Sequence, residues 1–227
     1  AGAGAGIYND GTLTLIGSVV SGNWIDTDAE FGCGIESIGD LTLIDSQVSD
    51  NHSGDGAVIS ASGTLTLIRS AVVANSRFLF GAIRSTGTAT VINSTVETWW
   101  DTTIAHNGTL TLIGSTVINH DVFGAIDATE AFVANSLIIG VRGGSTTCGG
   151  GVISGGGNIE SLGDTCNFTD PTDLVNVTAA ELNLGPLADY GGPTQTYALL
   201  PGSVAIDRIP ADECVDADGD PLTMDQR

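Results

Sequence analysis

The chain has 227 residues, of which 6 are Lys or Arg and 27 are Asp or Glu, so its formal net charge at pH 7 is −21. A surface this acidic repels phosphate backbones and anionic membranes, which argues against nucleic acid as a partner. No apolar run reaches the ~18–20 residues that a bilayer span needs, so membrane insertion is not expected. The 32 glycines and the aromatic content of 5% also point away from an ordinary helical globule.

The chain opens on Ala1 to Gly6 (AGAGAG), and Ile7 already belongs to the first repeat. There is no initiator Met, no basic segment and no apolar core of a signal peptide, so we expect any such peptide to have been removed. We also expect no N-terminal cap on the repeat, as in a processed subunit or a piece of a longer chain.

An internal repeat is the strongest signal in the sequence. Five copies align without gaps and a degraded sixth covers 129–141, with a serine at one fixed position in each copy. The copies are GTLTLIGSVVSGN (11–23), GDLTLIDSQVSDN (39–51), GTLTLIRSAVVAN (63–75), GTATVINSTVETW (87–99) and GTLTLIGSTVINH (108–120), with serines Ser18, Ser46, Ser70, Ser94, Ser115 and Ser136.

Within each copy, apolar and polar residues alternate with the period of a strand. We predict that one apolar column forms a continuous buried stack: Leu15, Leu43, Leu67, Val91 and Leu112. A short second element precedes most copies, so each period holds about three short strands. We therefore predict an all-β fold, a right-handed parallel β-helix of about six coils. Leucine-rich repeats share the period but need a helix-forming half, which these Gly-, Ser- and Thr-rich coils lack.

The composition changes after the repeat. All six prolines follow residue 170, and a glycine-rich stretch separates them from the coils. We predict a solenoid over 1–142 and a disulfide loop with a Pro-rich cap or tail over 143–227, including one short helix near 178–183. Residues 184–207 should lie along the solenoid flank, burying Leu199 and Leu200 together with aromatic side chains.

The segments CGGGVISGGGNIESLGDTCNF (148–168) and LGPLADYGGPTQTYALLPGSVAID (184–207), followed by Cys214 and DQR (225–227), resemble bacterial parallel β-helix surface proteins with a choice-of-anchor Q domain. The coils are similar to the same family, so the resemblance covers the whole chain. It implies a secreted or cell-surface location and a β-helix, and no particular chemistry. In the family a further segment follows DQR, and it is absent here.

The four cysteines suggest disulfides, with three possible connectivities. The family resemblance implies a Cys148–Cys166 pair, which would stabilise the fold by roughly 3 kcal/mol. It also implies that the usual partner of Cys214 lies in the absent segment, leaving Cys33 as the candidate here, within the chain or between adjacent subunits. The alternative is two free thiols.

Asp216, Asp218 and Asp220 have the spacing that brings alternate carboxylates around a Ca²⁺ ion, with Asp225 as a possible further ligand. The alternative is a solvated acidic turn. No other cofactor is expected.

Catalysis is not expected. The outward carboxylates Asp40 and Glu130 lie about four rungs, or roughly 19 Å, apart, too far for a two-carboxylate glycosidase. Threonine pairs on successive rungs resemble those of an ice-binding solenoid. The alternative is a purely structural role, because threonine also favours any half-exposed sheet.

Aromatic side chains gather between one main strand and the next coil. They either pack under the tail or form a glycan- or partner-binding stripe: Trp24, Phe31, Phe78, Phe80, Trp99, Trp100 and Phe123.

Together these features favour a non-enzymatic extracellular structural protein, a β-helix unit of a cell-surface adhesin or of a head-to-tail filament whose expected partners are copies of itself, with surface glycans as a second candidate. The alternative is a carbohydrate-binding or carbohydrate-cleaving β-helix.

Overall fold

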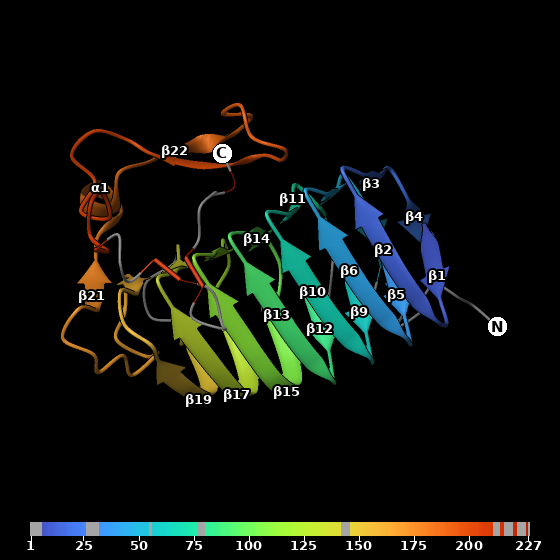
Figure 1. The fold of residues 1–227 in the computed structure, drawn as a ribbon, viewed down its shortest axis with the longest axis horizontal. Helices are drawn as coiled ribbons and strands as arrows, with labels where there is room; N and C mark the ends of the chain where they lie inside the picture. Colours follow the sequence, from blue (N-terminus) through green and yellow to red (C-terminus); the bar gives the residue numbers. More distant parts are fainter. Residues whose placement is uncertain are drawn as a thin grey trace.

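The structure is a computed structural model that describes residues 6–25, 32–54, 56–76, 80–141, 146–210, 214–215, 220–221 and 226. It is an all-β parallel solenoid, with one four-residue helix in the described part of the chain (Figure 1). Two parallel sheets run along its length, one of 11 strands and one of 8. The predicted fold class is confirmed.

The 11-stranded sheet contains two faces of each coil. The early coils place a short strand on one face and a longer one on the next, whereas the later coils use one strand that continues across both. The short strands are β1 (Ile7–Asn9), β5 (Ile35–Ser37), β9 (Ile59–Ala61) and β12 (Ile83–Ser85). The longer ones are β2 (Thr12–Ile16), β6 (Asp40–Ile44), β10 (Thr64–Ile68), β13 (Thr88–Ile92), β15 (Ile104–Ile113), β17 (Ile126–Ala134) and β19 (Cys148–Ser154).

The eight-stranded sheet forms the third face. Its strands are β3 (Val19–Ser21), β7 (Gln47–Ser49), β11 (Ala71–Val73), β14 (Thr95–Thr98), β16 (Thr116–Asn119), β18 (Leu137–Gly140), β20 (Ile159–Ser161) and β21 (Leu174–Val177). A small parallel pair, β4 (Trp24–Ile25) and β8 (His52–Ser53), extends the first two coils at their edge.

The register of the strands is the one that the sequence copies predict. Leu67 pairs with Leu43 on one side and with Val91 on the other, and Val91 pairs with Leu112. These four side chains are at most 1% exposed and form a continuous stack in the core. Leu15 belongs to the same column but is only half-buried, because among the described strands β2 has a neighbour on one side alone.

The fixed position of the serine within each copy has a hydrogen-bonding cause. At the turn between the second and third faces, the N–H of each serine donates to the hydroxyl of the serine one coil further on, for example Ser70 N–H to Ser94 Oγ at 3.0 Å. The same ladder runs from Ser18 to Ser136. A backbone donor buried at a bend costs free energy unless it finds such an acceptor, so the hydroxyl recurs in every copy.

The residue before each serine adopts a left-handed backbone conformation. Its φ is 46–59° at all six positions: Gly17, Asp45, Arg69, Asn93, Gly114 and Asn135. Gly, Asn and Asp tolerate this conformation, which explains the mixed, turn-like composition of the column. Arg69 is the strained member, and its guanidinium forms a two-pronged ion pair with Asp45 at 2.7 and 2.9 Å that helps to offset the strain.

The predicted boundary at residue 142 is wrong. The glycine-rich stretch forms β19, which pairs in parallel with β17, and β20 and β21 then extend the eight-stranded sheet. A parallel ladder is built from backbone groups and needs no side chain, so glycine does not end it. At Gly150, with φ +84°, a Cβ would collide with the carbonyl oxygen of Ala128, so this rung requires a glycine.

The segment after β21 packs back along the solenoid. It begins with α1 (Ala179–Leu182), and a capping box between Thr178 and Glu181 stabilises the start of this helix. An antiparallel hairpin of β22 (Leu184–Ala188) and β23 (Thr196–Leu199) follows and runs along the eight-stranded sheet (Figure 1). We call residues 184–199 the strap.

Two kinds of contact hold the strap. At the C-terminal coils an apolar cluster forms around Ile118, Ile139 and Leu182. Nearer the N-terminus the contacts are polar, such as Thr196 Oγ1 to Thr95 Oγ1 at 2.8 Å and Gln195 N–H to Gln47 Oε1 at 3.2 Å. Leu199 is half-buried, but Leu200 is 37% exposed, so the prediction that both are buried is wrong for Leu200.

The part of the chain that the structure describes contains no helix of the length and hydropathy that a membrane span requires.

Candidate functional site

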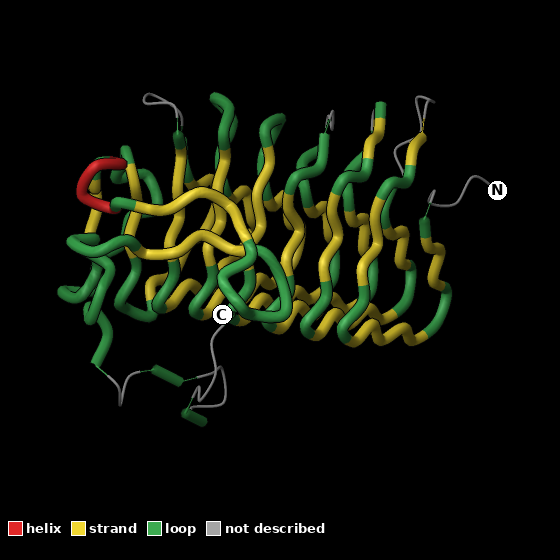
Figure 2. Tube along the Cα trace, turned by 90° about the horizontal axis from the view of Figure 1, so that it is seen from above, coloured by secondary structure: helices red, strands yellow, loops and turns green. Residues whose placement is uncertain are grey.

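The loops between the third face of one coil and the first face of the next project in a row along one edge of the solenoid (Figure 2). The repeat period shortens from 28 to 21 residues along the chain, and this change falls in these edge loops, since the spacing from main strand to serine is constant. Four exposed aromatic side chains lie here: Trp24, Trp99, Trp100 and Phe123. We call this row of loops the aromatic edge.

Trp99 is held in the aromatic edge by a stacked ring. Its ring stacks on that of His120, one coil further on, with centroids 4.0 Å apart and planes 8° from parallel. Thr98 pairs with Asn119 in the ladder, so the next residue on each strand falls side by side. Trp99 remains 55% exposed even so. The stack therefore fixes the orientation of the indole and leaves much of it available to a ligand.

His120 is in turn held by Glu97, a carboxylate only 3% exposed. Glu97 Oε2 lies 3.3 Å from His120 Nε2 and accepts a short hydrogen bond from the hydroxyl of Tyr197 in the strap. Glu97 Oε1 accepts from the N–H of Ala74 at 2.9 Å. Burial alone would raise the pKa of Glu97, but these hydrogen bonds outweigh burial and lower it. Burial and the adjacent carboxylate raise the pKa of Tyr197.

The loop after Trp99 is fixed from below by buried polar groups. Thr98 Oγ1 donates to the carbonyl of Trp100 at 2.8 Å. The fully buried amide of Asn119 donates to the carbonyls of Asp101 and Gly124 and accepts from the N–H of Asp121. These bonds hold two neighbouring loops in which Trp100, Val122 and Phe123 are each at least half exposed.

A second Trp–His pair lies at the first coils. Trp24 pairs with His52 across β4 and β8, and their ring centroids are 4.3 Å apart. Trp24 is 66% exposed, and His52 Nδ1 lies 3.1 Å from Ser76 Oγ. Phe80 is half-buried beneath the guanidinium of Arg84, 4.6 Å from the ring centroid.

The prediction that the aromatic residues pack under the tail is therefore wrong for Trp24, Trp99, Trp100 and Phe123. The strap instead covers the outer face of the eight-stranded sheet, where it finds hydrogen-bonding and aliphatic side chains. The stripe interpretation fits these four residues, while Phe31 and Phe78 lie outside the described residues.

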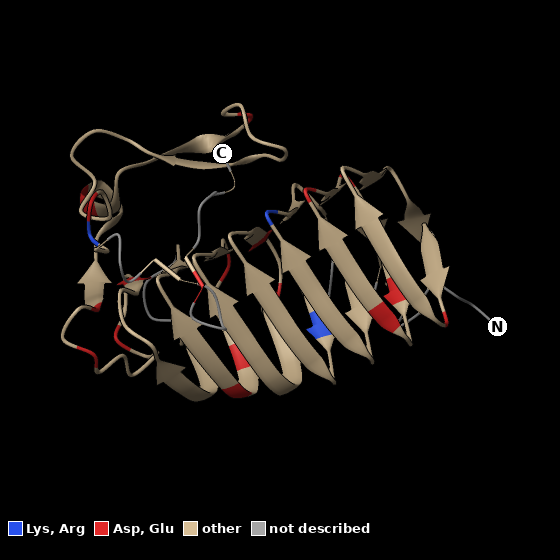
Figure 3. Cartoon of the chain, in the orientation of Figure 1, with Lys and Arg blue, Asp and Glu red and all other residues tan. Residues whose placement is uncertain are grey.

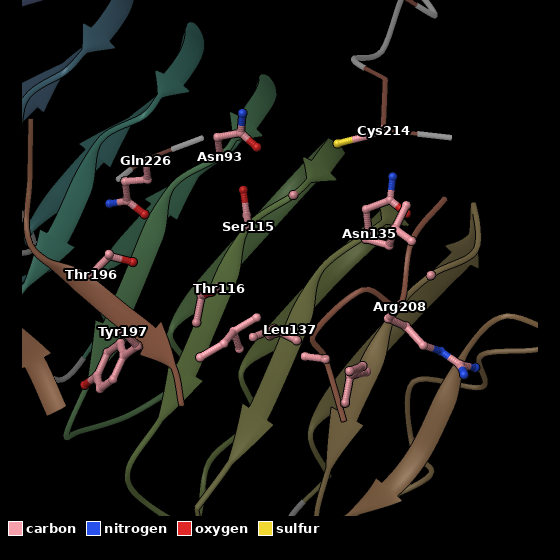
Figure 4. Close-up of a pocket in the computed structure, with 16 residues that line it drawn as sticks. Asn93, Ser115, Thr116, Asn135, Leu137, Thr196, Tyr197, Arg208, Cys214 and Gln226 are labelled. Carbon is pink, nitrogen blue, oxygen red and sulfur yellow. The ribbon is translucent and has the colours of Figure 1, made fainter. Parts of the chain in front are cut away.

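A cavity of about 270 Å³ lies between the strap and the solenoid (Figure 4). Its floor is formed by side chains of β16 and β18, including Thr116 and Leu137, and Tyr197 closes one side. Asn93 and Asn135 reach it from the turn column. Since the strap and later tail residues form much of its wall, we interpret it as the packing gap beneath the strap.

The predicted disulfide between Cys148 and Cys166 is present, with a Cα–Cα distance of 4.7 Å. The candidate Cys33–Cys214 bond is not formed in the described structure, where both residues are free thiols. Cys33 is fully buried in the core, and burial raises the pKa of its thiol to about 12. Because Cys33 is enclosed, a bond to an adjacent subunit would require its coil to open.

The candidate calcium ligands Asp216, Asp218 and Asp225 lie outside the described residues, and only Asp220 of this group is placed. In the described ranges, no group of three or more His, Cys, Asp or Glu side chains could hold a metal ion. The calcium site stays a prediction.

The outward threonines of the main strands lie in register, as Thr66 with Thr90 and Thr90 with Thr111. Charged side chains are few on this face (Figure 3). Asp40 interrupts one row and Phe132, 39% exposed, interrupts the other. Glu130 of β17 is paired with Thr109 of β15, and β15 lies three strands beyond β6, which carries Asp40. The two carboxylates are therefore four rungs apart, as predicted.

Sequence reasoning did not identify Glu97, His120, Asn119 or Tyr197 as parts of this site. A signal existed for one contact: Trp99 and His120 occupy the same column of the aligned copies, 21 residues apart. Tyr197 and Glu97 are 100 residues apart, and only the docking of the strap brings them together.

No family model matches the sequence, and no curated protein or solved structure matches it either. The resemblance to choice-of-anchor Q proteins stays a prediction.

Proposed function

We propose that the chain is a non-enzymatic extracellular protein, a rigid β-solenoid of a cell-surface adhesin that binds glycans through its aromatic edge. The observation that carries this proposal is the pair Trp99 and Trp100, which are 55% and 51% exposed on loops held by buried hydrogen bonds. Contiguous exposed apolar side chains on a soluble surface mark interaction sites. Indole faces suit the apolar C–H faces of sugar rings.

The rigidity of the loops supports a binding role. A ligand that meets pre-oriented side chains does not have to order them, so less of the contact energy is lost as entropy. The Cys148–Cys166 disulfide agrees with an oxidising, extracellular compartment. The separation of Asp40 and Glu130 supports a binding protein over a two-carboxylate glycosidase.

A glycan array followed by calorimetry on the best ligand tests the proposal. We expect Trp99→Ala/Trp100→Ala to lose at least ten-fold in affinity. Phe132→Ala is the matched control, because it removes an exposed aromatic ring from the face of β17 and should leave affinity unchanged. Absence of binding by the wild-type protein, or equal affinity of the wild-type and double-alanine proteins, would refute the proposal.

End-to-end assembly is a second candidate. Among the described strands, β1, β2 and β3 each pair on one side only, and Ile16 and Val19 at this end are 65% and 66% exposed. Unpaired strand edges of this kind accept further strands. Light scattering and negative-stain imaging should then show filaments that Val19→Lys abolishes, whereas a uniform 23.0 kDa species would exclude the assembly.

A further inference from the structure

The charges beside the two tryptophans have one sign. Asp101 follows Trp100 directly in the chain, and Asp121 follows His120, on whose ring Trp99 stacks. Both aspartates are half-buried, so part of each reaches the surface. The loop that carries the two indoles and the neighbouring loop of the next coil therefore each bear an acidic side chain.

The hydrogen bonds of these aspartates fix where the carboxylates lie. Asp101 Oδ1 accepts from the N–H of Thr102 at 2.7 Å, and Asp121 Oδ1 accepts from the N–H of Val122 at 2.8 Å. Each bond holds its carboxylate within a loop of the aromatic edge. The two negative charges thus have fixed positions in adjacent coils.

The whole chain adds to this local field. A net charge of −21 repels uronate and sulfate groups and attracts cations. The face of an indole also attracts cations, through its quadrupole. A sugar carrying an ammonium group would combine three favourable contacts: its C–H face on an indole, its charge near a carboxylate, and its charge near a second aromatic ring.

On these grounds, and resting on the glycan-binding role proposed above, we infer that the aromatic edge selects polysaccharides of amino sugars with free, positively charged amines. Neutral sugars would stack on the tryptophans without the electrostatic contribution. Uronic acids would be repelled. Selectivity therefore comes from Asp101 and Asp121, while Trp99 and Trp100 supply affinity for the ring.

Oligomers of equal length made from glucosamine, N-acetylglucosamine and glucuronic acid separate these contributions, because the first two share the sugar ring and differ at the nitrogen, which is a cationic ammonium in one and a neutral acetamide in the other. The permanently charged N-trimethyl form of the glucosamine oligomer holds that charge constant at neutral pH. We expect the cationic oligomers to bind more tightly than the acetylated one at low salt, by about two- to five-fold per carboxylate. The difference should shrink as salt is added.

Asp101→Asn and Asp121→Asn test the assignment. Asparagine keeps the Oδ1 acceptor and tolerates the left-handed backbone of Asp101, where φ is 57°, so the loops should keep their shape. Each variant should reduce affinity for the cationic oligomers and leave the acetylated one unchanged. Asp40→Asn is the matched control, because it removes an exposed charge from β6, on the main-strand face of an earlier coil, and should alter neither affinity.

The outcomes distinguish this inference from the proposed function. If the acetylated oligomer binds as tightly as the cationic ones at low salt, and Trp99→Ala/Trp100→Ala abolishes both, the selectivity is refuted and the glycan-binding role stands. If the cationic oligomers bind the double-alanine protein as well as the wild type, the contact is electrostatic only and the inference fails. If none of the oligomers binds the wild-type protein but another glycan of the array does, the inference fails and the glycan-binding role stands; if no glycan binds, both fail.

Discussion

Replacing Leu67 by alanine removes a side chain that is fully enclosed between Leu43 and Val91 of the neighbouring coils. The substitution deletes three carbon groups, and at ~0.8 kcal/mol for each the lost transfer energy is roughly 2.4 kcal/mol. The neighbouring coils are held by backbone ladders on both sides and cannot collapse into the space. The cavity term therefore adds to the transfer term, and we expect a loss of about 3–5 kcal/mol in the free energy of unfolding.

Leu15 provides a matched comparison. It occupies the same column in the first described coil but is only half-buried. Leu15→Ala should cost about 1–1.5 kcal/mol, because part of its surface is already in water and the end coil can relax.

Urea unfolding followed by circular dichroism measures both variants, with the slope m compared as well as the midpoint. An unchanged m would show that the coils unfold together, and a reduced m would show that the damaged coil melts separately. The packing argument predicts a clearly larger loss for Leu67→Ala. Equal losses for the two variants, or a loss below about 1 kcal/mol for Leu67→Ala, would refute the inferred continuity of the core stack.

Three further predictions concern titratable groups and the disulfide. The folded protein lowers the pKa of Glu97 below its ordinary value of about 4.3, so this group should stabilise the fold above that pH. The stabilisation should be lost as the pH falls through the folded pKa. Acid titrations should therefore show a smaller loss of unfolding free energy for Glu97→Gln than for the wild type. The native protein should react with a thiol reagent at Cys214 and not at Cys33, because burial raises the pKa of the Cys33 thiol to about 12. Mass spectrometry after labelling with and without denaturant measures this order of reaction. Reaction of Cys33 before Cys214 would contradict the fold. Replacing Cys148 and Cys166 by serine should cost roughly 3 kcal/mol, measurable in the same urea assay, and a loss near zero would show that the bond is not formed in solution.

The periodicity of the sequence determined most of the fold. A strand has a period of two, and a parallel stack repeats identical environments, so the aligned leucines and serines predicted the register of six coils. The same alignment placed Trp99 in the column of His120, which the structure shows as a stacked pair. Local patterns of this kind can be read from the chain because each coil contacts only its neighbours.

The tertiary structure alone decided three other features. The coils continue through the glycine-rich stretch, because a parallel ladder is made by backbone groups and leaves no side-chain pattern where glycine fills it. The strap meets Glu97 through Tyr197, a contact across 100 residues that no repeat encodes. The strap follows the flat sheet face instead of the edge loops, so the tryptophans, which the sequence placed either under the tail or in a binding stripe, remain exposed. Docking of a non-repeating segment depends on the shape and polarity of the assembled surface, which does not exist until the coils have stacked.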